Sequence, residues 1–208
     1  GNSIGIPRDK IRIIMNPTGA SFGWSTNAGD LCLAAAAAFI TKMPIALSMS
    51  NEEHQHFSGK RRPSHSNGRA ACDKNGKLTA VEFDYGLDQG PYTFGGDDII
   101  SKTARFAFFP YVVPNVTGLS RIAITNHNFG TAYRSYGSPQ AYTLSEALID
   151  MLAEKAGIDP FEFRWRNIAR EGELNINSCQ FRLYPMEEMM KMMKPYYDKA
   201  VKEAKEKD

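Results

Sequence analysis

The sequence predicts an α+β protein in which a mixed sheet and a hairpin are flanked by helices. A hairpin is indicated by Asn75-Gly76, a pair typical of two-residue turns. The strand after it alternates apolar residues through Val81, Phe83, Tyr85 and Leu87. Helical periodicity is just as clear after Ser138. Because strands and helices are intermixed without a regular alternation, the pattern favours α+β over a doubly wound sheet.

The first quarter of the chain predicts two strands and two helices. β-Branched alternation indicates strands at 10–16 and 45–50. A loop at 17–27 leads into an alanine-rich helix at 28–42, which we expect to be buried against a close neighbour. A short helix follows at 51–57, with its cap at one of the two residues Ser50 and Asn51.

Further helices are predicted along the rest of the chain. A helix at 96–109 precedes extended segments at 111–126, and another runs from a Ser138 cap to Gly157. A capping-box pattern starts a helix at 159–168, and a C-terminal helix covers 185–208. The apolar face expected for the Ser138 helix consists of Ala141, Leu144, Leu148, Met151 and Leu152. Methionines at helical spacing in the C-terminal helix are expected to pack in a core: Met186, Met189, Met190 and Met193.

Composition excludes several classes of protein. A length of 208 residues favours one domain or two closely joined ones, and a net charge of +2 argues against a nucleic-acid partner. Three separated cysteines, Cys32, Cys72 and Cys179, argue for a reducing, cytoplasmic environment and cannot hold an iron–sulfur cluster. No apolar run reaches the roughly 20 residues of a membrane span, so we expect no membrane partner.

Two loops stand out, because each precedes a helix and carries glycine. "TGASFGWS" at 18–25 follows a predicted strand, where backbone N–H groups can donate hydrogen bonds to an anion. It matches neither a P-loop nor a dinucleotide-binding fingerprint. "GTAYRSYG" at 130–137 adds Arg134, which with the helix start predicts an anion-accepting corner. Tyr133 and Tyr136 offer flat walls to a planar ligand, although a purely structural role of the loop explains it equally well.

Other polar clusters have simpler explanations. His54 and His56 are two apart and have no third ligand at suitable spacing, so we predict no metal site. The basic "GKRRP" at 59–63 is expected to be a solvated loop, with a phosphate-binding role as the less favoured alternative. No catalytic residue is assigned.

The two loops, taken in order, resemble the G-G-x-F-G and A-F-R-G-[FY]-G-x-P-Q loops of the molybdenum hydroxylases. This family includes xanthine oxidase and aldehyde oxidoreductase. The stretches between and after the loops, from "SGKRRPSHSNGRAACDKNGKLTAVEFDYGLDQGPY" to "SEALIDMLAEKAGIDPFEFRWRN", are similar as well. The resemblance covers nearly the whole chain and is greatest to bacterial aldehyde oxidoreductases. It implies a part of a molybdopterin-binding domain.

The resemblance implies a role for individual residues in these loops. The cofactor-binding residues it implies are Gly19, Ser21, Phe22, Gly23, Ala132, Tyr133 and Arg134, and those of the substrate pocket are Thr26 and Tyr136. Ala20 and Ser135 stand where the family has glycine, and Trp24-Ser25-Thr26 also departs from its pattern.

The implied activity is hydroxylation of aldehydes to carboxylic acids with a molybdopterin cofactor, expected in its cytosine dinucleotide form. The family's general-base glutamate and its iron–sulfur domains would lie outside this chain. We therefore expect residues 1–208 to be one domain of a larger, homo-oligomeric enzyme, inactive alone, whose other parts are its partners. A purine or heteroaromatic hydroxylase, an aromatic acyl-CoA reductase and a non-catalytic interaction module remain alternatives.

Overall fold

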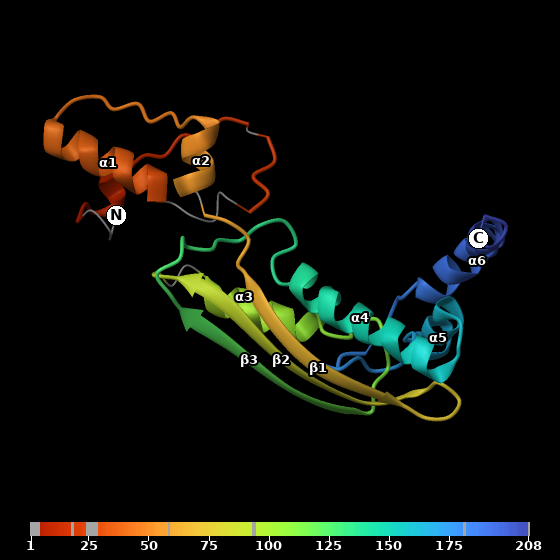
Figure 1. Ribbon diagram of the computed structural model, residues 1–208. Helices are drawn as coiled ribbons and strands as arrows, with labels where there is room; N and C mark the ends of the chain where they lie inside the picture. The colour runs from red at the N-terminus through yellow and green to blue at the C-terminus, as the bar shows by residue number, and fades with distance from the viewer. Residues whose placement is uncertain are drawn as a thin grey trace. The chain divides into compact units, whose positions relative to one another are not determined.

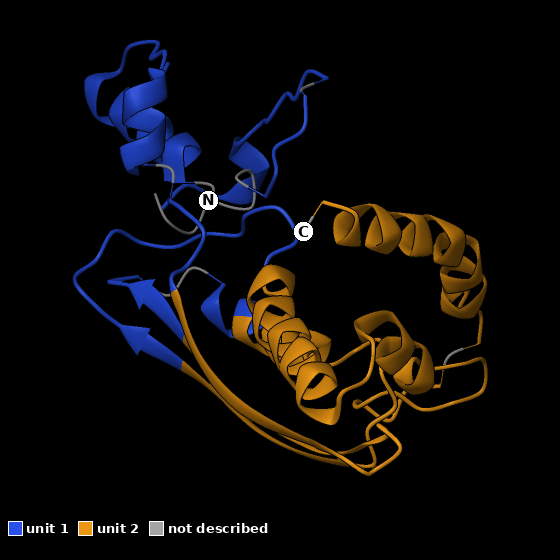
Figure 2. Cartoon of the chain, turned by 45° about the vertical axis from the view of Figure 1, so that its right-hand side comes forward, with its two compact units in different colours: residues 1–63, 87–99, 122–136 blue, residues 64–86, 100–121, 137–208 orange. Residues whose placement is uncertain are grey.

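A computed structural model gives the structure of residues 5–17, 19–23, 29–57, 59–92, 95–180 and 182–207 (Figure 1). The chain divides into two compact units, shown in Figure 2. Unit 1 comprises residues 1–63, 87–99 and 122–136, and unit 2 comprises residues 64–86, 100–121 and 137–208.

Unit 2 is built on a three-stranded sheet of order β1-β2-β3. Its strands are β1 (Ser64–Cys72), β2 (Leu78–Gly90) and β3 (Asn115–Ile124), of which 87–90 and 122–124 count with unit 1. The predicted hairpin joins β1 to β2, and Gly76 takes the left-handed conformation (φ 75°) that its turn requires. Helix α4 (Ser138–Ala156) packs against β1 (Figure 1).

The core of unit 2 lies between the sheet and α4. Val81, Phe83 and Tyr85 are buried, as their alternation predicts. The Tyr85 hydroxyl donates a 3.0 Å hydrogen bond to the carbonyl of Ala141 on α4, so its polar end is satisfied in the core. Burial also raises the pKa of Tyr85.

Three more helices lie wholly or partly in unit 2. They are α3 (Gly96–Phe106), α5 (Pro160–Asn167) and α6 (Met186–Lys205). Asp159 caps α5 as predicted, with its carboxylate accepting hydrogen bonds from the N–H groups of Phe161 and Glu162, each 3.0 Å. Asn167 closes α5 onto the hairpin, because its side chain accepts from the N–H of Leu78 and donates to the carbonyl of Gly76.

In unit 1 the structure describes a short 3₁₀ helix η2 (Arg8–Lys10) and two α-helices, α1 (Gly29–Thr41) and α2 (Asn51–Phe57). Ser50 is the residue that caps α2: the N–H of Glu53 donates to its hydroxyl (3.2 Å), and its own N–H donates to the Glu53 carboxylate (2.8 Å).

The strands predicted at 10–16 and 45–50 were wrong. Both segments lack regular secondary structure, apart from the end of η2 at Lys10, and the side chains of Ile13 and Ile14 are exposed. A strand needs a partner to pair its backbone groups, and the described residues supply none to either segment. Alternating apolar residues in these two segments therefore do not indicate a strand.

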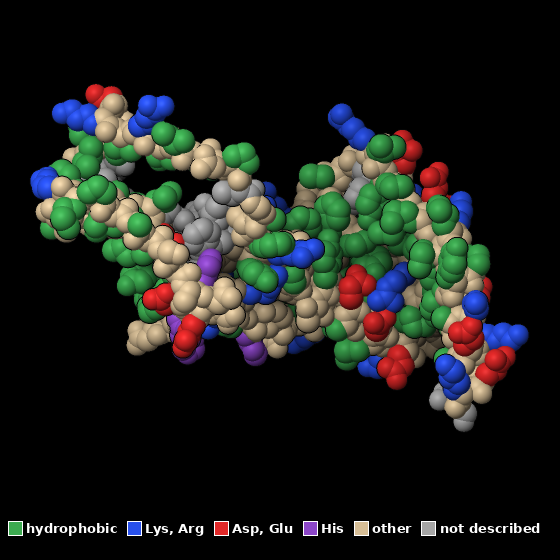
Figure 3. Space-filling view, turned by 90° about the horizontal axis from the view of Figure 1, so that it is seen from above, with side chains coloured by type: hydrophobic (Ala, Val, Ile, Leu, Met, Phe, Trp, Pro, Cys, Tyr) green, Lys and Arg blue, Asp and Glu red, His purple; other side chains and the backbone are tan. Residues whose placement is uncertain are grey.

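Burial of α1 was also predicted wrongly. None of its residues is buried, and Leu31, Leu33, Phe39 and Ile40 are more than half exposed. Hydrophobic side chains are accordingly visible on the surface around this helix in Figure 3. Alanine content promotes the helix itself, but within the described chain no element covers it.

Two apolar faces differ from prediction. On α4 the buried stripe is Ala141, Ser145, Ile149 and Ala153. The predicted Leu144 and Leu148 are half-buried and lie against Gly68 of β1, whereas the predicted Met151 is exposed. On α6 only Met190 of the four methionines is buried, while Met189 and Met193 are more than half exposed. The helix contacts α5 through Tyr197, whose ring lies 5.1 Å from that of Phe161, and Met190 lines a pocket together with Phe161 and Trp165.

The cap of α4 is Gly137, with φ 89°, and no side chain caps this helix. Ser138 is instead its first residue, which moves the predicted cap by one position. The left-handed turn at Gly137 explains the difference, because a glycine reaches this conformation without steric cost and leads the chain into the helix.

Candidate functional site

The two predicted loops meet within unit 1. The N–H of Arg134 donates a 2.7 Å hydrogen bond to the carbonyl of Phe22, and the Arg134 guanidinium lies 5.6 Å from the centre of the Phe22 ring. A side chain at Gly23 would place its Cβ 2.7 Å from the carbonyl oxygen of Ala132. The loops therefore touch backbone to backbone, and only glycine permits this approach at position 23.

The first loop has a strained backbone at the contact. Phe22 has a φ of 52° and Gly23 a φ of 101°, while Ser135 in the second loop has a φ of 58°. Such conformations cost energy in residues other than glycine and gather at functional sites. Phe22 and Ser135 therefore hold their loops in shapes that the local sequence alone disfavours.

A third segment, 59–62, pairs with the second loop. Lys60 pairs with Gly130 in a parallel bridge, and the N–H of Thr131 donates to the Lys60 carbonyl over 3.0 Å. Gly59, with φ 83°, approaches Thr131 so closely that a Cβ there would collide with the threonine side chain. This parallel pairing connects 59–62 to the loop at 130–134.

Arg62 anchors this segment. It is 2% exposed, and its Nη1 donates a hydrogen bond to Oε1 of Gln89 at the end of β2. Its stem occupies the space where a side chain at Gly130 would lie. Burial lowers the pKa of Arg62, an effect that the charge of Asp88 partly offsets.

The prediction of a solvated loop at 59–63 was therefore wrong for Arg62, although Lys60 and Pro63 are exposed. A basic run in sequence usually lies in solvent, but here strand-like pairing to a segment 70 residues away carries Arg62 into the interior. The signal available in the sequence was the inclusion of "GKRRP" in the stretch that resembles the family.

These three segments line a pocket of about 560 Å³ together with residues of α2. Its size is typical of sites for small molecules and cofactors. The lining residues are Ala20, Ser21, Phe22, His54, Gln55, Gly59, Lys60, Arg61, Thr131, Ala132 and Tyr133. None of these residues is acidic, and Lys60 and Arg61 carry positive charge.

The predicted site residues are distributed unevenly around this pocket. Ser21, Phe22, Ala132 and Tyr133 line it. Gly23 and Arg134 make the contacts that close the two loops, while the space around Gly19 is open. Half-buried Tyr136 is not among the lining residues, and Thr26 lies outside the described residues.

Sequence reasoning did not include seven residues of the lining, namely Ala20, His54, Gln55, Gly59, Lys60, Arg61 and Thr131. The guanidinium of Arg61 stacks on the Tyr133 ring at 4.8 Å, and its Nη2 donates to the carbonyl of Arg134 over 2.9 Å. Arg61 therefore holds the second loop through both its ring contact and its hydrogen bond. The side chain of Arg134, another predicted cofactor-binding residue, is exposed, and its guanidinium lies over the Phe22 ring.

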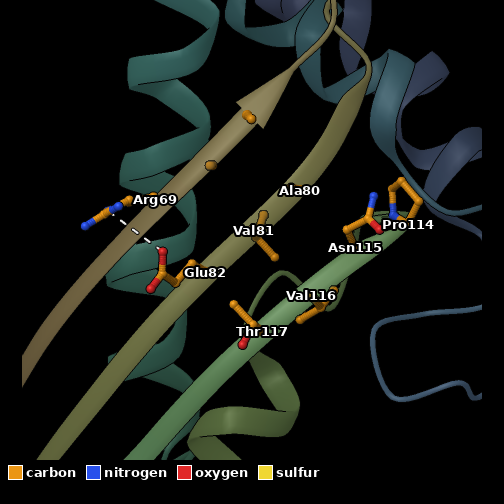
Figure 4. Close-up of a pocket in the computed structure, with 10 residues that line it drawn as sticks. Arg69, Ala80, Val81, Glu82, Pro114, Asn115, Val116 and Thr117 are labelled. Atoms are coloured by element: carbon orange, nitrogen blue, oxygen red, sulfur yellow. Dashed lines mark ion pairs between the residues drawn. The ribbon is translucent and has the colours of Figure 1, made fainter.

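A second pocket, of about 540 Å³, lies in unit 2 on the three strands (Figure 4). Its charged lining residues are Arg69 and Glu82, which form an exposed 3.8 Å ion pair with each other. The rest of the lining is small or apolar, as Val81 and Val116 illustrate in Figure 4. No glycine is among the described residues that line this pocket, and its two charged residues neutralise each other. The pocket in unit 1 is therefore the better candidate for a functional site.

The described residues contain no group of three or more histidine, cysteine, aspartate or glutamate side chains that could hold a metal ion. Nor is any of the described helices both long and apolar enough to cross a bilayer. The pocket in unit 1 instead offers glycine-lined backbone and cations, a combination that suits a bulky anionic ligand.

Fold and site thus define a cofactor-binding domain, in which two glycine-bearing loops close over a cationic pocket. The comparisons with known proteins identify the kind of cofactor-binding domain. Residues 2–168 match the family model described as molybdopterin cofactor-binding domain. The chain belongs to this family, which confirms the resemblance seen in the sequence.

Named relatives agree with this assignment. Aldehyde oxidoreductase of Megalodesulfovibrio gigas is 37% identical over 201 residues, which cover 97% of this chain and 22% of that protein. The large molybdopterin subunit of nicotinate dehydrogenase from Eubacterium barkeri is 32% identical over 169 residues, covering 81% of this chain and 40% of that subunit. The chain therefore spans less than half the length of either relative.

A solved structure confirms the fold. Aldehyde oxidoreductase from Desulfovibrio gigas superimposes with a TM-score of 0.93 and 35% sequence identity, over 97% of this chain and 22% of that one. The α+β fold with a small sheet, predicted as part of a molybdopterin-binding domain, is thereby confirmed.

Proposed function

We propose that this chain holds the molybdopterin cofactor of an enzyme that oxidises aldehydes to carboxylic acids. The observation that carries the proposal is the closure of the two loops through the Arg134–Phe22 hydrogen bond and the Gly23–Ala132 approach. The similarity to aldehyde oxidoreductase, which covers nearly the whole chain, supports the choice of substrate class.

The residues of the pocket fit such a cofactor. Its volume of about 560 Å³ admits a pterin-sized ring system. Gly59 lines the pocket, and Gly23 lets the two loops that line it touch at Ala132. Lys60 and Arg61 supply positive charge for phosphate oxygens, which bind arginine well.

Individual residues would hold and orient the bound cofactor. Phe22 and Tyr133 give the pocket aromatic surfaces against which a planar ring packs and excludes water. Ser21 offers a hydroxyl at the same surface, and Ala132 brings loop backbone to the pocket. The cofactor, when bound, supplies the two-electron redox chemistry of the oxidation.

No acid–base catalyst is assigned to this chain. Since the described lining contains no aspartate or glutamate, we propose that the general base comes from another part of the full-length protein. We also propose that the full-length protein contains iron–sulfur domains and a second molybdenum-binding part. Its cofactor is proposed to have the cytosine dinucleotide form, and the enzyme to be a homo-oligomer.

Substrate choice is proposed to depend on Tyr136 and Thr26. A second candidate substrate class is a heteroaromatic ring, favoured by the 32% identity to a nicotinate dehydrogenase subunit. Activity of the full-length protein on aromatic aldehydes and on nicotinate distinguishes the two. The free thiols of Cys32, Cys72 and Cys179 agree with a reducing compartment, for which we propose the cytoplasm.

The test is metal and pterin analysis of the full-length protein, purified without added cofactor. We expect about one molybdenum per polypeptide, with pterin fluorescence after denaturation. A folded protein that contains neither would refute cofactor binding and would favour a non-catalytic module.

A further inference from the structure

Arg61 has hydrogen-bonding capacity that the described chain does not use. Its Nη2 donates to the Arg134 carbonyl at 2.9 Å, and its guanidinium stacks on Tyr133. Its Nη1 is buried and has no hydrogen-bond partner within the described part of the chain. A buried guanidinium N–H without an acceptor is unfavourable. The pocket that Arg61 lines is where a ligand could provide that acceptor.

The charge around Arg61 selects the kind of ligand. Lys60 lines the same pocket, and the lining contains no carboxylate. Neither Lys60 nor Arg61 forms an ion pair with any carboxylate of the described residues. Two positive side chains without a counter-charge attract an anion, and a guanidinium fork suits the geometry of phosphate oxygens.

Arg61 is also held in place for this role. Stacking on Tyr133 fixes the plane of the guanidinium, and the bond from Nη2 fixes its rotation. The neighbouring Arg62 is committed elsewhere through its bond to Gln89. Arg134 is exposed and lies over Phe22. Of the three arginines, Arg61 alone lines the pocket.

We propose that Arg61 is an oxyanion-binding residue, whose Nη1 takes a phosphate-type oxygen in this pocket while Nη2 holds the second loop. The inference rests on the proposed function in that the pocket is the cofactor site. It adds a specific residue in the segment 59–62 and links anion binding to the position of Arg134. Binding an anion at Nη1 fixes the same guanidinium that holds the Arg134 carbonyl.

The test uses the full-length protein in cofactor-free form, obtained from a host that cannot make molybdopterin, with inorganic pyrophosphate as probe. Arg61→Gln removes the charge and Arg61→Lys retains it without the fork. Arg69→Gln is the matched control, because Arg69 lies on β1 in unit 2 with a side chain that is 87% exposed. Calorimetric titration measures pyrophosphate affinity, and circular dichroism with thermal unfolding shows that each variant is folded.

Arg61→Gln is expected to weaken pyrophosphate binding at least about tenfold, as loss of a charge-assisted hydrogen bond does. Arg61→Lys is expected to fall in between, and Arg69→Gln to match the wild type. Unchanged affinity in folded Arg61→Gln, or no saturable binding by the wild type, would overturn the inference.

Cofactor-loaded protein distinguishes the two sources of the anion. If the cofactor's own phosphate occupies the site, loaded wild-type protein will not bind pyrophosphate and Arg61→Gln will retain less molybdenum. If the site takes free phosphate, loaded and cofactor-free protein will bind the probe equally; either result supports an anion site. Wild-type protein that never contains molybdenum refutes the proposed function, but it leaves the pyrophosphate comparison intact.

Discussion

Replacing Gly23 by alanine tests whether close contact of the two loops is what holds the cofactor. The new Cβ would lie 2.7 Å from the Ala132 oxygen, whereas ordinary contacts begin at 3.4 Å, so the loops must separate by about 0.7 Å (3.4 − 2.7). A shift of that size along the 2.7 Å Arg134–Phe22 hydrogen bond would stretch it to about 3.4 Å, where little attraction remains.

The free-energy cost follows from these two changes. A left-handed backbone costs an L-residue about 1–2 kcal/mol, and Gly23 has a φ of 101°. Loss of the hydrogen bond adds about 1 kcal/mol. Together, about 2–3 kcal/mol correspond to roughly 30- to 150-fold weaker binding of any ligand that needs closed loops.

The assay is molybdenum and pterin per polypeptide in the full-length Gly23→Ala protein, after dialysis, with thermal unfolding as a check on folding. Gly86→Ala is the matched control, because Gly86 lies on β2 in unit 2, its Cβ would meet His65 at an ordinary 3.5 Å, and its φ is not in the left-handed range. We expect the control to keep its cofactor and Gly23→Ala to lose most of it. Equal occupancy in the two variants would refute the reasoning.

Three other predictions concern stability. Asn167→Ala should cost about 2–4 kcal/mol, because it strands the buried N–H of Leu78 and two carbonyls; calorimetry should show a lower Tm, and an unchanged Tm would contradict it. Ser135→Gly should stabilise by up to about 1 kcal/mol, since relief of its left-handed strain exceeds the added chain entropy; denaturant unfolding measures this, and destabilisation would be the contrary result. Asp88 has a pKa lowered to about 2 by hydrogen bonds from His127, Thr125 and the backbone. Because its folded pKa lies below the unfolded value near 3.9, its contribution is present above pH 4 and lost towards pH 2; the stability gap between wild type and Asp88→Asn should close over that range, and a constant gap would exclude it.

Elements whose determinants are local were predictable from the sequence. The Asn75-Gly76 turn, the alternation along β2 and the Asp159 cap each depend on a few neighbouring residues, and the structure contains all three. The strands expected at 10–16 and 45–50 failed for the opposite reason. Extended structure depends on a pairing partner, which a local pattern cannot supply.

In the candidate site, too, local features could be predicted from the sequence and features that depend on distant contacts could not. The two loops could be found because their residues occur as contiguous motifs that resemble a family. That Phe22 has a left-handed backbone could not be inferred, since phenylalanine disfavours that conformation. For Ser135 the one signal was the glycine that the family has at this position, because glycine is typical of a positive φ. Their strain comes from the contact between the loops, which the chain makes only after folding.

The segment 59–62 shows why a basic run misleads when it is interpreted alone. Along an extended segment, successive side chains point to opposite sides. Pairing of Lys60 with Gly130 sets which side each arginine takes. Arg62 enters the interior and bonds to Gln89, whereas Arg61 lines the pocket and stacks on Tyr133. Two identical neighbours thus acquire different roles, because Arg62 anchors the segment 59–62 and Arg61 lines the pocket, and a shift of one residue in the pairing would exchange them.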